Sequence, residues 1–236
     1  MEVVKPDKRN ILLNPGPATT SDAVKYAQVI PDICPIEQEF VDVMTGVRKD
    51  LVKVVHGDPE KYTSVIFAGS GTIVQDVLVN SLVPEGKKIM VVNNGAYAAR
   101  MVKIAKFYHI DCVDLQFSTT GLPDLAKVKK AIEEDKDIAV VAAVHHETGT
   151  GVLNPIREIG RMAHDNDCIF IVDTISTYGL RPIDIEEENI DFLMSSAQKG
   201  LAAMTGASWT VGNIKAIEKS KDYPTRSYYC NLFMQY

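Results

Sequence analysis

Features that mark membrane, secreted and nucleic-acid-binding proteins are scarce in this sequence. No stretch approaches the roughly 18 apolar residues of a membrane-spanning helix. The opening MEVVKPDKRN carries mixed charges in place of the apolar core of a secretory signal. Lys and Arg number 25 against 31 Asp and Glu, a formal net charge of −6, so no positive excess attracts nucleic acid or an anionic membrane. We predict a cytoplasmic protein whose partners are small molecules or other proteins.

Potential metal ligands are equally sparse. The four cysteines are far apart and show no CxxC spacing: Cys34, Cys112, Cys168 and Cys230. We interpret them as reduced thiols. The segment VHHETG offers His145, His146 and Glu147, but adjacent residues of a strand point to opposite faces and rarely share one ion. We therefore predict no metal site.

The sequence does contain a regular alternation of apolar and amphipathic segments. Helical periodicity, as in IVQDVLVNSLV and LAKVKKAIEED, separates four short β-branched runs: SVIFA, KIMVV, DIAVVAAV and CIFIVD. Apolar strands alternating with helices predict a mostly parallel sheet that is buried on both faces. Weaker strands near IDCVDLQ, IDFLMSS and GASWTVG bring the total to about seven, which favours one large open α/β sheet over an eight-stranded barrel.

The two ends of the chain differ from this pattern. The segment ILLNPGPATT contains two prolines and a glycine, which exclude a helix there. Further on, the apolar spacing predicts an amphipathic helix over residues 37–56. RSYYCNLFMQY is rich in aromatics and lacks a closing signal, so we expect a chain cut short of its natural end. We predict an N-terminal arm over 1–20, a large domain over 21–220, and the start of a connection to a missing C-terminal small domain over 221–236.

The first candidate site is FAGSGT, residues 67–72, which follows the strand SVIF and opens a helix near Ile73. Its glycines allow a tight turn in which backbone N–H groups and the Ser70 and Thr72 hydroxyls converge at the positive end of a helix, as a phosphate requires. The Gly-Lys-Ser/Thr ending of a P-loop is absent, and Val74 stands where GxGxxG needs its third glycine. A plain strand-to-helix turn is the alternative.

Two charged side chains are expected at one edge of the sheet. In IFIVDTIST an apolar strand delivers Asp173 at its C-terminal end, the edge at which parallel sheets bind ligands. Lys199 follows one predicted strand further on, as the only charged residue of SSAQKGLAAM. Burial of a lysine favours the neutral, nucleophilic amine. The alternatives are an aspartate that caps a helix and a lysine that reaches solvent.

A phosphate cradle, a strand-end aspartate and a partly buried lysine together match the needs of pyridoxal 5'-phosphate. The turn at 70–72 would anchor the phosphate, and Asp173 would keep the pyridine nitrogen protonated so that the ring accepts electrons. Lys199 would form a Schiff base with the cofactor aldehyde. Each feature alone is weak, whereas their order and spacing favour this cofactor.

Six segments carry a resemblance to a known family: LLNPGPATTSDAVK, GSGT, NNGAYAAR, HHETGTGVLNP, VDTISTYGLRPIDI and SSAQKG. In this order they resemble the class V branch of fold-type I aminotransferases, from about Ile11 to about Asn213. The resemblance implies the large domain of a fold-type I transferase that depends on pyridoxal phosphate. It also implies a homodimer with each active site at the subunit interface.

The resemblance implies roles for individual residues. Lys199 would bind the cofactor covalently, and Asp173 would pair with the pyridine nitrogen. The phosphate would be held by Ser70, Gly71 and Thr72. Tyr97 would lie on the pyridine face, Thr148 toward the ring oxygen, and Gln198 beside the lysine. Gly16, in NPGP, would border the substrate.

Within the family, the segments are most similar to enzymes that transfer the amino group of 2-aminoethylphosphonate to pyruvate, giving phosphonoacetaldehyde and alanine. Gln198-Lys199-Gly200 replaces the usual Asn-Lys-Cys of that group and is closer to alanine–glyoxylate aminotransferases. An alanine- or serine-glyoxylate activity is therefore the alternative. A third reading is a truncated, non-catalytic cofactor-binding domain, because relatives continue into a small C-terminal domain.

Overall fold

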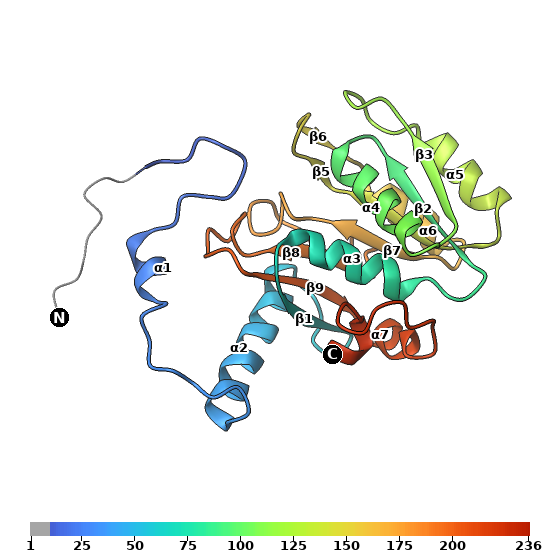
Figure 1. Ribbon diagram of the computed structural model, residues 1–236. Helices are drawn as coiled ribbons and strands as arrows, with labels where there is room; N and C mark the ends of the chain where they lie inside the picture. The colour runs from blue at the N-terminus through green and yellow to red at the C-terminus, as the bar shows by residue number, and fades with distance from the viewer. Residues whose placement is uncertain (1–9) are drawn as a thin grey trace.

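A seven-stranded sheet organises residues 10–236, the part of the chain that the computed structural model describes. In spatial order its strands are β1 (Tyr62–Ala68), β9 (Ala207–Asn213), β8 (Phe192–Ser196), β7 (Ile169–Asp173), β4 (Ile138–Val144), β2 (Lys88–Asn93) and β3 (Cys112–Gln116) (Figure 1). β9 runs antiparallel to both of its neighbours, and the other pairs are parallel. The predicted mostly parallel sheet of about seven strands is confirmed.

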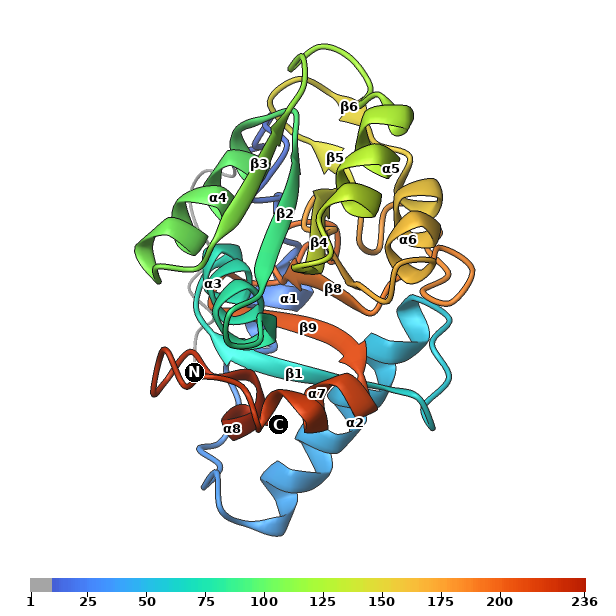
Figure 2. The same cartoon turned by 90° about the vertical axis from the view of Figure 1, so that its right-hand side faces the viewer.

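Helices cover both faces of this sheet (Figure 2). One face carries α3 (Gly71–Leu82), α4 (Ala96–Phe107), α7 (Ile214–Ser220) and α8 (Leu232–Gln235). The other face carries α2 (Gln38–Val54), α5 (Leu125–Glu134) and α6 (Ile156–His164). The domain is therefore a three-layer α/β/α arrangement with a core on each side of the sheet.

The central strand β4 explains why both faces are covered. Val141 and Ala143 pack in the core beneath α5 and α6, whereas Val140 and Ala142 pack in the core beneath α3 and α4. All four side chains are fully buried. Because successive strand residues point to opposite faces, an uninterrupted apolar strand must be covered twice.

A short hairpin follows β4 at the edge of the sheet. It consists of β5 (His146–Glu147) and β6 (Val152–Leu153), paired antiparallel around a turn that contains Thr148 and Gly151. The sequence prediction did not include this hairpin, because strands of two residues have no measurable alternation. The hairpin lies beside the C-terminal end of β7, since the Ser176 hydroxyl, three residues after β7, donates to the His146 carbonyl oxygen.

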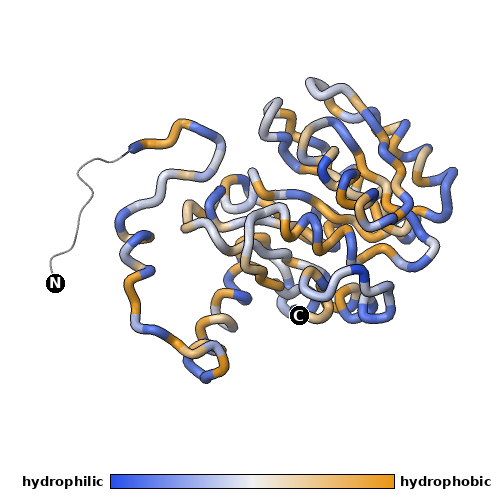
Figure 3. Tube along the Cα trace, in the orientation of Figure 1, coloured by the Kyte–Doolittle hydropathy of each residue, from blue (hydrophilic) through white to orange (hydrophobic). Residues whose placement is uncertain are grey.

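The N-terminal segment lies apart from the sheet, as Figure 1 shows. It contains α1 (Asp22–Tyr26) and leads into α2, on which only Leu51 and Val52 are buried. The predicted helix over 37–56 is therefore present, but most of its apolar face is exposed. Orange apolar stretches mark the same segment in Figure 3, and the Leu13 side chain is 96% exposed. Residues 1–9 of the predicted arm lie outside the described residues.

The last residues pack back onto α3. The Arg226 guanidinium donates hydrogen bonds to the carbonyl oxygens of Asn80 and Val83, each at 2.8 Å, and Leu232 of α8 is fully buried. Tyr228 remains 83% exposed. The segment 221–236 thus combines a buried anchor with exposed aromatic surface.

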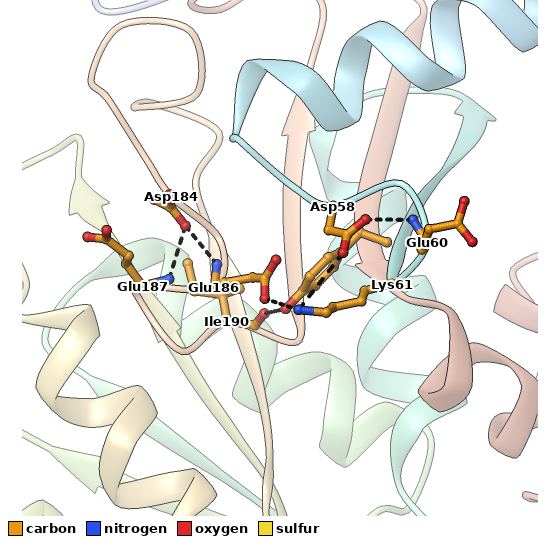
Figure 4. Close-up of polar contacts among 8 residues, drawn as sticks. Asp58, Glu60, Lys61, Asp184, Glu186, Glu187 and Ile190 are labelled. Atoms are coloured by element: carbon orange, nitrogen blue, oxygen red, sulfur yellow. Dashed lines mark hydrogen bonds and ion pairs between the residues drawn. The ribbon is translucent and has the colours of Figure 1, made fainter.

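A cluster of polar contacts joins the start of β1 to the loop between β7 and β8 (Figure 4). Lys61 forms an ion pair with Glu186, and the Tyr62 hydroxyl lies 3.4 Å from the carbonyl oxygen of Ile190. The Asp184 carboxylate accepts hydrogen bonds from two backbone N–H groups within the loop. These contacts hold the loop against the sheet at the edge opposite the candidate site.

Candidate active site

Three strands end at one edge of the sheet and bring the candidate residues together. β1 and β8 run parallel, because each is antiparallel to β9, and β7 is parallel to β8. The turn after β1 carries Ser70, β7 ends at Asp173, and β8 ends at Ser196, shortly before Lys199. Asp173 and Lys199 line one cavity, as their order along the sheet predicts.

Asp173 is the buried acid of this edge, with only 3% of its surface exposed. Its Oδ1 accepts a hydrogen bond from the Ile175 N–H group at 2.9 Å, and its Oδ2 accepts one from the Gln75 side-chain amide at 2.6 Å. Burial raises the pKa of Asp173 to about 6, although both hydrogen bonds act to lower it. The carboxylate can therefore be ionised at neutral pH and face a cationic partner.

Lys199 is half-buried and contacts the N-terminal arm. Its Nζ donates to the carbonyl oxygen of Gly16 at 3.3 Å, and the Ala18 N–H group donates to the carbonyl oxygen of Gln198 at 2.8 Å. A Cβ atom at position 16 would overlap the Lys199 side chain, and the φ of +144° also favours glycine. The structure thus places Gly16 directly against Lys199.

The N-terminus of α3 opens into a cavity of about 160 Å³. Ser70 precedes the helix and makes no side-chain capping hydrogen bond. Its hydroxyl therefore does not occupy the backbone N–H groups at the positive end of α3. Ser196 is buried, and its hydroxyl has no partner among residues 10–236. The Arg100 guanidinium donates to the Thr72 hydroxyl at 3.2 Å. Hydroxyls, a helix N-terminus and a cation therefore converge here, as an anion requires.

A second, smaller cavity of about 10 Å³ adjoins the first. Tyr97 and Lys199 line both spaces, and Thr148 and Asp173 line the second. The Glu147 carboxylate accepts a hydrogen bond from the Ala98 N–H group at 3.0 Å and so caps the first turn of α4. This cap holds the helix turn that carries Tyr97 at the cavity.

The adjacent histidines have different environments. His145 is buried beside the Thr177 hydroxyl, and burial lowers its pKa to about 4, so it is neutral. His146 instead lines the smaller cavity. The Ser176 hydroxyl donates its one proton to the His146 carbonyl at 2.8 Å, so His146 Nδ1, 3.1 Å from the same oxygen, must donate to it. Nε2 is then the ring nitrogen left for another partner.

The donor set fits pyridoxal phosphate. Ser70, Thr72 and the Ser196 hydroxyl line one cavity, which suits a phosphate. The Asp173 carboxylate lines the adjoining cavity, and the Lys199 amine lines both. A side chain at Gly71 would crowd the first cavity, because a Cβ atom there would lie 2.6 Å from Ile175 and 3.4 Å from the Ser196 hydroxyl. Asp173 would hold the protonated pyridine nitrogen, and Lys199 would bind the aldehyde.

The sequence analysis did not single out four residues of this site, namely Gln75, Arg100, Ser196 and, except as a metal ligand, His146. Ser196 ends a buried strand and Gln75 interrupts an apolar helix face, so a polar residue in an apolar context was the available signal. Arg100 and His146 carried no such signal. The predicted site residues Ser70, Gly71, Thr72, Tyr97, Thr148, Asp173, Gln198 and Lys199 all line one or both cavities.

A cavity of about 440 Å³ lies away from the candidate site, between α2, β1 and Tyr236, and no carboxylate or histidine side chain lines it. Within residues 10–236, no three His, Cys, Asp or Glu side chains are placed to hold a metal ion. Over the same residues, no helix is both long and apolar enough to cross a membrane.

The fold is that of a fold-type I aminotransferase. Residues 23–224 match the family described as Aminotransferase class-V. The chain belongs to this family, whose members use pyridoxal phosphate, and the resemblance carried by the six sequence segments is confirmed.

Individual relatives are substantially longer than this chain. A bifunctional phosphonoacetaldehyde hydrolase/aminoethylphosphonate transaminase of Clostridioides difficile (strain 630) is 38% identical over 216 residues, 92% of this chain and 34% of the relative. The 2-aminoethylphosphonate–pyruvate transaminase of Lysinibacillus sphaericus (strain C3-41) is 35% identical over 225 residues, 95% of this chain and 61% of the relative. The crystal structure of an alanine–glyoxylate aminotransferase from Nostoc sp. superposes with a TM-score of 0.88 at 25% identity, over 99% of this chain and 62% of that one. The chain therefore spans less than two thirds of each.

Proposed function

We propose that this chain binds pyridoxal phosphate at the described site and, within the whole enzyme, transfers the amino group of 2-aminoethylphosphonate to pyruvate. The products are phosphonoacetaldehyde and alanine. Identity of 35% and 38% to the two bacterial relatives supports this substrate pair. When bound, the cofactor supplies an electron-accepting ring conjugated to the reacting carbon.

One observation carries the proposal: the Lys199 amine and the Asp173 carboxylate line one cavity, and the open N-terminus of α3 lines the adjoining one. Asp173 would hold a proton on the pyridine nitrogen through charge. Lys199 Nζ would take the proton that leaves the carbon bearing the amino group and return it during transfer. Ser70, Thr72 and Ser196 would bind the phosphate and fix the ring.

Amino transfer to glyoxylate from alanine or serine is the second candidate function. The observation that favours it is the Gln198-Lys199-Gly200 sequence, in which the Gln198 Oε1 atom is buried without a partner among the described residues. A panel of amino donors and both acceptors separates the candidates. Preference for 2-aminoethylphosphonate with pyruvate supports the first, and preference for alanine or serine with glyoxylate supports the second.

The oligomeric state also forms part of the proposal. We infer a homodimer, because the arm, α2 and the segment between them expose apolar side chains that the described sheet does not cover, among them Leu13, Ile36 and Val43. Light scattering of the whole protein should give twice the chain mass, and a monomer at micromolar concentration would contradict the inference. A non-catalytic domain would bind the cofactor but form no alanine.

The central test is the site of covalent attachment. Wild-type protein mixed with pyridoxal phosphate should develop a visible absorbance band, and borohydride reduction should add the cofactor mass to the peptide that contains Lys199. Lys199→Ala should lose both signals and keep its far-UV circular dichroism. Lys215→Ala, at an exposed position of α7, is the control and should keep both. A cofactor adduct on another lysine would overturn the proposed site.

A further inference from the structure

Gln75 is a buried polar residue without a role in the chemistry described so far. It lies on α3 with no exposed surface, next to Val74 and close to Val77 and Leu78, which fill the core beneath the helix. Burying an amide is costly unless its hydrogen bonds are made. An apolar side chain of similar size would satisfy the packing, so the amide itself requires an explanation.

The nitrogen and the oxygen of the Gln75 side-chain amide differ in their hydrogen bonding. Nε2 donates to Asp173 Oδ2 at 2.6 Å and lies 3.4 Å from the carbonyl oxygen of Tyr97. Oε1 is buried and has no partner among residues 10–236. Turning the amide by 180° would set Oε1 against the carboxylate, an unfavourable contact between two acceptors. Asp173 therefore sets the orientation of the amide, and Oε1 is left without a partner among the described residues.

The contacts of Gln75 join three parts of the site. Its side chain starts from α3, whose N-terminus faces the phosphate cavity, and reaches β7 at Asp173 and the first turn of α4 at Tyr97. Both of these residues line the smaller cavity. A single amide thus links the carboxylate to the backbone of the residue expected on the ring face.

We propose that Gln75 is a positioning residue that keeps the Asp173 carboxylate ionised and in place at the inner end of the cofactor site. The inference rests on the proposed function, because it assigns Asp173 to the pyridine nitrogen. A protonated aspartic acid could not hold a protonated ring nitrogen by charge. Gln75 donates a charge-assisted hydrogen bond, which is stronger to the ionised carboxylate than to the protonated acid.

Several other groups face Asp173, and they oppose one another. Burial raises its pKa most, and the Glu147 carboxylate raises it further, whereas the Ile175 N–H group, Gln75 and Arg100 lower it. His146 and Lys199 line the same cavity, and the His145 N–H group binds the Asp173 carbonyl oxygen. With the pKa at about 6, the ionised form prevails at pH 7 by only about one pH unit. A rise of the pKa by about one to two pH units on removal of one favourable hydrogen bond is expected to leave roughly half or more of the carboxyl groups protonated at pH 7.

The test that needs no cofactor is a carboxyl-carbon NMR titration of the apo protein, with the Asp173 signal assigned by its loss in Asp173→Asn. In Gln75→Leu the titration midpoint of Asp173 should rise by roughly one pH unit or more, the range expected for loss of a hydrogen bond to a charged group. If the leucine variant does not fold, Gln75→Met serves as the second variant. Its Asp173 titration midpoint should show the same rise.

Asn80→Leu is the matched control for loss of a buried amide. Asn80 is a fully buried amide of the same helix, but it binds Asp76 and the Cys230 carbonyl, away from the site. This variant should leave the Asp173 midpoint unchanged. An unchanged midpoint in folded Gln75→Leu and Gln75→Met would overturn the inference.

The loaded enzyme supplies an independent readout. At pH 7, Gln75→Leu should lower kcat by roughly two- to tenfold, with less than about a twofold change in KM for the amino donor, and the loss should shrink at higher pH. A loss that is the same at every pH would indicate a merely structural role and contradict the inference. If wild-type protein gives no absorbance band with pyridoxal phosphate, the proposed function fails, whereas the apo titration still decides whether Gln75 controls Asp173.

Discussion

The Lys199 amine nitrogen lies 3.3 Å from the carbonyl oxygen of Gly16, although 183 positions separate the two residues in the sequence. The contact brings the N-terminal arm to the C-terminal edge of the sheet. It is reinforced by the backbone hydrogen bond from Ala18 to Gln198. The arm therefore meets the candidate site at Lys199 and Gln198.

Gly16→Ala should impair the site without unfolding the domain. The added Cβ atom would overlap the Lys199 side chain, and alanine disfavours a φ of +144°. We expect the arm to detach from the Gln198 loop and cofactor affinity to fall at least tenfold, measured by absorbance titration. Gly149→Ala is the control, since a Cβ atom there meets no atom within 4 Å. Equal affinities of the two variants would argue against the arm as part of the site.

Asp173→Asn should stabilise the apo protein at neutral pH. Because burial raises the pKa of Asp173 from 3.8 to about 6, the folded state holds the proton more tightly than the unfolded state between these values. The stability of the wild type therefore falls as pH rises from about 4 to about 6 and levels off above. An asparagine carries no charge to bury, and the Gln75 amide can turn to offer Oε1 to it.

The Asn variant should gain up to roughly 3 kcal/mol at pH 7, by conversion of the pKa difference, and the gain should vanish near pH 4. Urea unfolding at both pH values measures it. A stability difference that does not change with pH would contradict this account. Turnover in the loaded enzyme should fall sharply, because an amide cannot balance the charge on the pyridine nitrogen.

Thr72→Ala should weaken cofactor binding by about 1 to 3 kcal/mol, the usual cost of removing one hydrogen bond to a charged group. Its hydroxyl lines the cavity at the N-terminus of α3 and accepts a hydrogen bond from Arg100. Equilibrium dialysis with pyridoxal phosphate gives the dissociation constant. Thr119→Ala, at an exposed position outside the site, should bind as the wild type does. An unchanged constant for Thr72→Ala would move the phosphate away from this turn.

His164 and Asp191 should couple more strongly at low pH than at high pH. The hydrogen bond from His164 Nε2 to Asp191 Oδ2, 2.9 Å long, raises the pKa of His164. The ion pair therefore contributes fully below the ordinary histidine value near 6.5 and is lost as pH rises through the raised one. His164 is about 40% exposed, so solvent screening limits the coupling to roughly 0.2 to 1 kcal/mol.

A double-mutant cycle of His164→Gln and Asp191→Asn, followed by urea unfolding, isolates this coupling. Asparagine retains an oxygen for the Phe170 N–H group that Asp191 binds at 2.8 Å, so the backbone contact persists in both arms. We expect coupling at pH 5.5 and close to none at pH 9. Coupling of the same size at both values would show that the contact does not depend on protonation.

The sequence by itself determined the sheet and the family. Uninterrupted apolar runs such as that of β4 identify strands buried on both faces, because a strand covered twice has no polar side. Asp173 and Lys199 were identifiable because Asp173 ends one buried strand and Lys199 follows the next, and the ends of parallel strands meet at one edge. The two-residue strands β5 and β6 escaped this reasoning, since no periodicity can be measured over two residues.

Only the tertiary structure decided which side chains meet at that edge. Gln75 binds Asp173 across 98 positions, and Gly16 reaches Lys199 across 183. Local periodicity determines that a segment is a helix or a strand, whereas such pairings depend on the order β1-β9-β8-β7 and on the path of the arm. A buried amide in an apolar helix signals that a partner exists, but the partner is chosen by strand order, which no short stretch of sequence encodes.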